Sequence, residues 1–285
     1  MLYYLIDYIE QLYHPPGFQV IRFITVRAAL ASITALGIAL VAGRSIIDWL
    51  QRQQLGEQVR EGAAAGAVNH GHKAGTPTMG GIIILLSVGG ATLLWGAIAN
   101  TYVWLALGAT AGLGALGFLD DYLQTVEGYE QGLRPRYKLL GQLAIGLGVG
   151  GVLYFHPAFQ AYNTLTFLPF LKGQVVDYDL FRFWNMGVDL GWVVYLPVVV
   201  FIMTAVSNAV NLTDGLDGLT TGVTAFVSLG LLALAYISGN VNFATFLNVM
   251  YLPGTGELTV FVAAVAASCF GFLWYNGYPA TVFMG

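Results

Sequence analysis

Seven long stretches that are almost free of charge constrain the fold of this chain more than any other feature. They are apolar throughout and contain no charged side chain except Arg27, which lies near the start of the first stretch. An α-helix of about 20 apolar residues crosses the hydrocarbon core of a bilayer. The sequence therefore predicts an all-α polytopic integral membrane protein with spans at 23–43, 79–99, 102–119, 139–155, 192–210, 219–238 and 258–274.

The composition excludes the common soluble classes. Only 9% of the 285 residues are charged and 57% are hydrophobic, whereas a soluble domain carries about 25% charged residues. A net charge of −4 also argues against a surface that follows nucleic-acid phosphates, so no nucleic-acid partner is expected. We expect residues 1–285 to form a single membrane domain surrounded by the lipid bilayer.

The connections between the spans differ in their content of Lys and Arg. One set, 44–78, 120–138, 211–218 and 275–285, carries seven of the 11 basic residues. Because cytoplasmic loops are enriched in Lys and Arg, this set is predicted to be cytoplasmic and the N-terminus to lie outside. The other set includes 156–191, whose alternating pattern is compatible with a short extracytoplasmic β-hairpin, and 1–20, which is compatible with an interfacial segment.

Two adjacent carboxylates, Asp120 and Asp121, end the third span on the predicted cytoplasmic side. Neighbouring carboxylates repel each other unless a cation or a proton lies between them. Successive helical positions point about 100° apart, so the two acids can take different roles. One could hold a divalent cation while the other acts as a base or orients a phosphate. A simple solvated helix end is the alternative.

A second polar group recurs at every third position where the fifth span ends. It consists of Asn208, Asn211, Asp214 and Asp217. Three-residue spacing keeps these side chains on one side of a helix, where they supply amide donors and hard oxygen ligands for Mg²⁺. Helix capping by Asn and Asp would explain one or two of them.

Basic and aromatic residues follow on the same predicted face. Lys73 lies in a loop punctuated by Gly and Pro, which can present a cation and hydroxyls to a phosphate. Lys138 either anchors the loop or contacts a phosphate near the acid pair. The aromatic residues of 274–285 form either an interfacial belt or a platform for a base. This face suits phosphoryl chemistry between a soluble phosphorylated molecule and a lipid.

Several of these motifs together resemble one enzyme family. The segments Pro77–Gly81, Asp120–Tyr122, Asn208–Gly218 and Phe283–Gly285, with Lys73, are similar in order to the phospho-N-acetylmuramoyl-pentapeptide transferases. These enzymes belong to the polyprenyl-phosphate N-acetylhexosamine-1-phosphate transferase superfamily. The resemblance implies a Mg²⁺-dependent transfer from UDP-MurNAc-pentapeptide to undecaprenyl phosphate, which gives lipid I and UMP for peptidoglycan synthesis on the inner face of the bacterial cytoplasmic membrane.

The resemblance also implies roles for individual residues. Those expected to be catalytic are Asp120, Asp121 and Asp214, and the expected metal ligands are Asp120, Asp121 and Asn211. The aromatic ring of Phe283 is expected to stack on uracil. The other expected substrate-binding residues are Lys73, Thr78, Lys138, Asn208, Asn211, Gly215, Leu216 and Asp217.

The family pattern extends past the end of this chain. In the family, Phe-Met-Gly is followed by an Asp that is a principal Mg²⁺ ligand, and ten spans are present. The chain is therefore expected to be C-terminally incomplete. An inactive fragment or binding scaffold, a transferase of another UDP-amino-sugar and an ion-coupled transporter stay open as alternatives. Family members also often form homodimers, so a homodimer is a further expectation.

Overall fold

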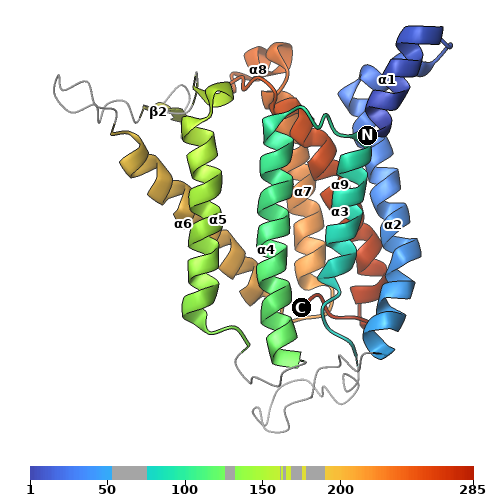
Figure 1. Ribbon diagram of the computed structural model, residues 1–285, viewed down its shortest axis with the longest axis vertical. Coiled ribbons are helices and arrows are strands. Elements are labelled where there is room, and N and C mark those ends of the chain that lie inside the picture. Colours follow the sequence, from blue (N-terminus) through green and yellow to red (C-terminus); the bar gives the residue numbers. More distant parts are fainter. Residues whose placement is uncertain (53–75, 126–131, 161, 163–164, 168–174, 178–189) are drawn as a thin grey trace.

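The computed structural model describes residues 1–52, 76–125, 132–160, 162, 165–167, 175–177 and 190–285 as a helical bundle (Figure 1). The long helices are α2 (Ile24–Arg52), α3 (Gly81–Trp95), α4 (Thr101–Thr125), α5 (Pro135–Phe155), α6 (Trp192–Thr213), α7 (Leu219–Ser238) and α9 (Leu258–Asn276). The shorter elements are α1 (Leu2–Tyr13), η1 (Phe18–Arg22), η2 (Pro157–Phe159), β1 (Leu165–Phe167), β2 (Val175–Asp177), α8 (Val241–Leu247) and η4 (Thr255–Glu257).

Each predicted span corresponds to one long helix. Within the described residues, six helical segments are long and apolar enough to cross a membrane, which makes the chain a multi-pass membrane protein. The exception is α3, which has 15 residues where 79–99 was predicted. At 1.5 Å per residue it is about 22 Å long, short of the ~30 Å of a bilayer core. Its backbone turns extended at Gly96, where ψ is 154°, and this ends the helix.

The helix α9 lies at the centre of the bundle and packs against α2, α3 and α7. Small residues allow the close approach of α2 and α9: a Cβ added at Gly271 would lie 2.6 Å from the Cβ of Ala39. A second packed group joins α5 to α6, where Gly146 faces Val200 in the same way. Small residues therefore allow these two helix pairs to approach closely, as expected for membrane helices.

The described parts of the two sets of connections lie at opposite ends of the bundle (Figure 1). α1, α8 and the strand β2 lie at one end, and the C-terminus lies at the other with the ends of α2 and α4. The predicted hairpin is confirmed as a pair of three-residue strands, because β1 and β2 pair antiparallel with Leu165 opposite Asp177. The predicted division of the loops into two groups is thus reproduced by the fold.

A buried ion pair at the α1 end was missed by the sequence analysis. The guanidinium of Arg27 in α2 binds both carboxylate oxygens of Glu257 at 2.6 Å each, although the residues are 230 positions apart. The ring of Tyr3 lies 4.4 Å from the same guanidinium. The amino group of Met1 donates to the carbonyl of Leu94 at 3.0 Å, which fastens α1 to the end of α3.

Candidate active site

The acid pair lies in the last turns of α4, and Asp120 is held by two donors. Its Oδ2 accepts a hydrogen bond from Nζ of Lys138 at 2.7 Å, and its Oδ1 accepts one from the N–H of Leu133 at 2.8 Å. Gly132 has a φ of 58°, and a Cβ there would lie 2.6 Å from the same Oδ1. The charge of Lys138 is therefore directed at Asp120 in this structure.

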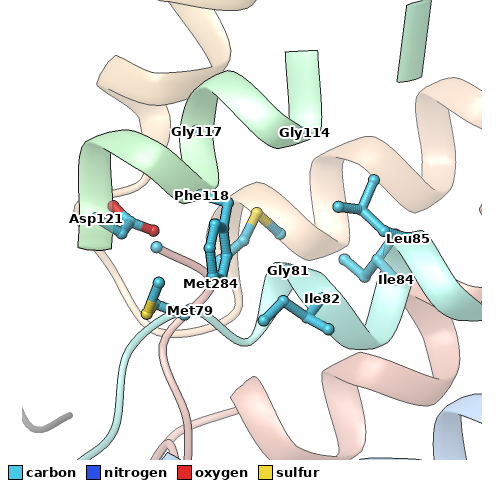
Figure 2. Close-up of a pocket in the computed structure, with 11 residues that line it drawn as sticks. Met79, Gly81, Ile82, Ile84, Leu85, Gly114, Gly117, Phe118, Asp121 and Met284 are labelled. Atoms are coloured by element: carbon cyan, nitrogen blue, oxygen red, sulfur yellow. The ribbon is translucent and has the colours of Figure 1, made fainter. Parts of the chain in front are cut away.

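Asp121 faces a different environment. Its side chain lines a pocket between α3, α4 and the C-terminal segment (Figure 2). The charged groups that interact with it electrostatically are Asp120, Lys138 and Asp214. A Cβ built on Gly285 would clash with Oδ2 of Asp121, so the C-terminal backbone passes directly beside this carboxylate. Of the two acids, Asp121 is the one turned toward the pocket.

The pocket has a volume of about 220 Å³ and is apolar apart from Asp121 at one edge. Figure 2 shows the side chains of Met79, Phe118 and Met284 around the pocket that Asp121 lines. In this pocket a single carboxylate therefore lies beside an apolar surface. The remaining lining residues are Gly81, Ile82, Ile84, Leu85, Gly114, Gly117 and Gly285.

Two motifs that are far apart in the sequence pair through their backbones. The N–H of Phe283 donates to the carbonyl of Pro77 at 2.9 Å, and the N–H of Gly80 donates to the carbonyl of Phe283 at 2.9 Å. The N–H of Gly81 continues this ladder with the carbonyl of Met284 at 2.8 Å. The partly buried Thr78 lies within the paired segment. The ladder places Phe283 against the loop that opens α3.

Gly80 is required where this ladder forms. A Cβ on Gly80 would lie 2.7 Å from the carbonyl oxygen of Phe283 and 2.8 Å from the ring of Phe272. The preceding residue, Met79, is 2% exposed and has a φ of 74°, a left-handed conformation that costs about 1–3 kcal/mol for a residue with a side chain. Such strain persists because the surrounding ladder holds the backbone.

The polar group at the end of α6 divides into two parts. The amide of Asn208 exchanges hydrogen bonds with Gln142 of α5 at 3.0 and 3.4 Å and donates to the carbonyl of Thr204 at 2.8 Å. Its side chain thus joins two helices. Asn211 is exposed on the last turn of α6. The helix ends at Thr213, so the remaining residues of the group lie on the loop that follows.

The loop from Asp214 to Gly218 contacts the C-terminal segment. Oδ2 of Asp217 accepts a hydrogen bond from the N–H of Ala280 at 3.3 Å. Gly218 has a φ of 75°, which turns the chain into α7. On this loop Gly215 and Leu216 are exposed, with 62% of Leu216 accessible.

One residue of the site was missed from the sequence. Asn276 is the last residue of α9, is 3% exposed and hydrogen-bonds to both the α6–α7 loop and the C-terminal segment. The feature that could have identified Asn276 is a polar amide in the final turn of an otherwise apolar span. From the sequence, only the aromatic residues around it were considered. Among the predicted residues, Lys73 lies outside the described part of the chain.

The chemistry of the donors fits a magnesium ion carried with a phosphate. Within the described ranges, no group of three or more His, Cys, Asp and Glu side chains gathers at one point. Mg²⁺ is commonly bound through one or two carboxylates, with water and substrate phosphate completing an octahedron. Of the carboxylates at the site, Asp120 binds Lys138 and Asp217 accepts from Ala280, whereas Asp121 and Asp214 interact electrostatically and could serve as such donors.

A bundle of membrane helices with carboxylates, amides and a lysine gathered at one end defines a membrane protein with a polar site at the bilayer surface. The model of glycosyl transferase family 4 matches residues 103–285, and the phospho-N-acetylmuramoyl-pentapeptide-transferase signature 1 matches residues 73–85. The chain belongs to glycosyl transferase family 4 and, within it, to the phospho-N-acetylmuramoyl-pentapeptide-transferases.

Curated relatives of that name match the whole chain. The protein from Salinibacter ruber is 81% identical over 285 residues, which cover 100% of this chain and 74% of the relative. The protein from Chloroherpeton thalassium is 46% identical, covering 100% of this chain and 73% of that relative. The one from Flavobacterium johnsoniae is 40% identical over 313 aligned residues, covering 100% and 76%. The chain thus spans about three quarters of the length of these relatives.

Proposed function

We propose that the site transfers phospho-MurNAc-pentapeptide from UDP-MurNAc-pentapeptide to undecaprenyl phosphate, producing lipid I and UMP at the inner face of the bacterial cytoplasmic membrane. The observation that carries the proposal is the meeting of separate motifs at one end of the bundle. Asp121, the Pro77–Gly81 loop, Asp217 and Phe283 are joined by backbone and side-chain contacts although they are distant in sequence.

The transfer is a displacement at phosphorus. An oxygen of undecaprenyl phosphate attacks the phosphorus that carries the sugar, a new P–O bond forms, and the bond from this phosphorus to the UMP oxygen breaks. Bound Mg²⁺ would neutralise negative charge on the phosphates. Asp121 and Asp214 are the proposed carboxylates for this ion, with Asn211 exposed nearby on α6 as a further oxygen donor.

The two adjacent acids are proposed to have different roles. Asp121 faces the apolar pocket, so it is suited to meet the phosphate of a lipid and to accept its proton. Asp120 is ion-paired with Lys138 and keeps that lysine beside the reacting groups. We assign the charge of Lys138 a second role in attracting substrate phosphate.

The nucleotide is proposed to bind on the opposite side of the site. The exposed Gly215 and Leu216 with Asp217 form one wall, and the ring of Phe283 is proposed to stack on uracil. We assign Lys73 and Thr78 to the diphosphate, since Thr78 lies in the loop paired with Phe283. Asn208 supports this wall by joining α6 to α5.

The test is UMP release from UDP-MurNAc-pentapeptide by the purified chain in detergent with undecaprenyl phosphate. UMP formation that depends on both substrates supports the proposal. Release only from another UDP-amino-sugar would select a related transferase. No release by this chain, alongside release by the Salinibacter ruber relative under the same conditions, would select the inactive scaffold. The oligomeric state is proposed to be a homodimer, which light scattering of the same sample would measure.

A further inference from the structure

The side chain of Asn276 joins three separate pieces of the site. Its Oδ1 accepts hydrogen bonds from the hydroxyl of Thr221 at 2.8 Å and from the N–H of Gly218 at 3.2 Å. Its Nδ2 donates to the carbonyl of Val282 at 3.0 Å. The amide is therefore bonded on both of its polar atoms while the residue is only 3% exposed.

The partners of Asn276 flank the residues proposed to bind the nucleotide. Gly218 follows Asp217 directly at the end of the α6–α7 loop, and Val282 directly precedes Phe283. Asn276 terminates α9, the most buried of the candidate membrane spans in the described part of the chain, so it offers a fixed point to which both segments attach. One side chain thus fixes the spacing between two walls of the site.

A second contact runs in parallel with the amide. The N–H of Ala280 donates to Asp217, which closes a small ring of hydrogen bonds between the loop and the C-terminal segment. Phe283 is in turn paired with Pro77 and Gly80. A change at Asn276 would therefore be transmitted through backbone contacts to the ring of Phe283 and to the carboxylate of Asp217.

We propose that Asn276 is a positioning residue for the nucleotide side of the site, an inference that rests on the proposed function. It holds the Asp214–Gly218 loop against the Val282–Gly285 segment, so that their side chains receive the uridine nucleotide in one arrangement. Buried amides with every polar atom paired specify geometry strongly, because any displacement leaves a donor or an acceptor without a partner.

The test compares Asn276→Ala and Thr221→Val with the matched control Thr220→Val. Thr221 and Thr220 are neighbours on α7 and are 0% and 2% exposed. The hydroxyl of Thr221 donates to Asn276, whereas that of Thr220 has no partner among the described residues. Replacing Thr by Val keeps the shape in both cases. Only Thr221→Val removes a contact with the amide of Asn276.

Two measurements separate positioning from general stability. The first is the Kd of UDP measured by calorimetry on the purified full chain, and the second is the KM of each substrate. We expect Asn276→Ala to weaken UDP binding about tenfold and Thr221→Val about threefold, corresponding to the loss of buried hydrogen bonds. The KM for undecaprenyl phosphate should change by less than about twofold, which corresponds to well under 1 kcal/mol. Thr220→Val should leave all three constants unchanged.

The possible outcomes test the positioning role of Asn276 and the proposed function separately. Unchanged UDP binding in a folded Asn276→Ala, or equal losses for both substrates, would overturn the positioning role. If Asn276→Ala does not fold, the milder Thr221→Val measured against Thr220→Val decides the question. A wild-type chain that binds UDP but releases no UMP would contradict the proposed function, while its UDP affinities would still test Asn276.

Discussion

The ammonium of Lys138 lies 2.7 Å from Oδ2 of Asp120, and this ion pair gives two adjacent aspartates different surroundings. Both side chains of the pair are about one-fifth exposed, at 21% and 19%. Asp121, one position later, is rotated by about 100° on the helix and lines the apolar pocket instead. The helical rotation and a single lysine together distinguish the two acids.

The first prediction concerns this division. We expect Asp121→Asn to lower kcat for UMP release by about 10²–10⁴-fold, the usual contribution of a positioned acid or base. Asp120→Asn keeps an oxygen that can accept from the N–H of Leu133, so its loss should be smaller. Initial rates at saturating concentrations of both substrates measure the difference. The proposed roles fail if both variants turn over at near-normal rates.

The second prediction concerns the close approach at Gly80. Gly80→Ala would force a methyl group against the carbonyl of Phe283 and the ring of Phe272, at a cost of about 1–3 kcal/mol in unfolding free energy. Gly81→Ala is the matched control, since its nearest contact, the carbonyl of Met284, lies at an ordinary 3.4 Å. We expect only Gly80→Ala to lower the Tm in detergent, with a parallel loss of activity.

Equal Tm values for these two glycine variants would contradict the ladder between the α3 loop and the C-terminal segment. Backbone strain does not contribute to the effect expected for Gly80→Ala. Gly80 has a φ of −63°, which any residue adopts, so a loss on substitution reports the steric contact alone.

The third prediction concerns the buried pair at the other end of the bundle. Arg27→Met alone leaves the Glu257 carboxylate without its cation and should destabilise the fold by about 3–5 kcal/mol. The double variant Arg27→Met/Glu257→Leu removes both charges and should recover most of that loss. Thermal unfolding of the single and double variants measures the coupling. Additive losses in the double variant would show that the two side chains act independently.

The fourth prediction concerns the metal. Removing divalent cations with EDTA should abolish UMP release, and added Mg²⁺ should restore it, because charge on transferring phosphates needs neutralisation. In Asp214→Asn the concentration of Mg²⁺ that gives half-maximal activity should rise relative to wild type. Full activity in EDTA would show that the site works without a divalent cation.

The sequence predicted the spans well because bilayer solvation acts on each segment locally. A helix in hydrocarbon must be apolar along its whole length, so 102–119, 192–210 and 219–238 could be recognised without any knowledge of their neighbours. The error came at 79–99, where the helix is only 15 residues long. Hydropathy does not register that the backbone turns extended at Gly96, or that Gly80 pairs with Phe283 just before the helix begins.

The candidate site likewise combines residues that the sequence predicted with contacts that only the fold creates. Motif spacing identified Asp120, Asp121 and Asp214 as candidates, and the family resemblance added Phe283, because residue type and order are properties of the chain alone. Tertiary structure determined that Lys138 binds Asp120, that Asn208 serves helix packing and that Asn276 ties two loops together. Apart from the hydrogen bond between Asn276 and Val282, which are six positions apart, these contacts join residues at least 18 positions apart. Their pairing depends on which helices pack side by side, and no local pattern in the sequence specifies that.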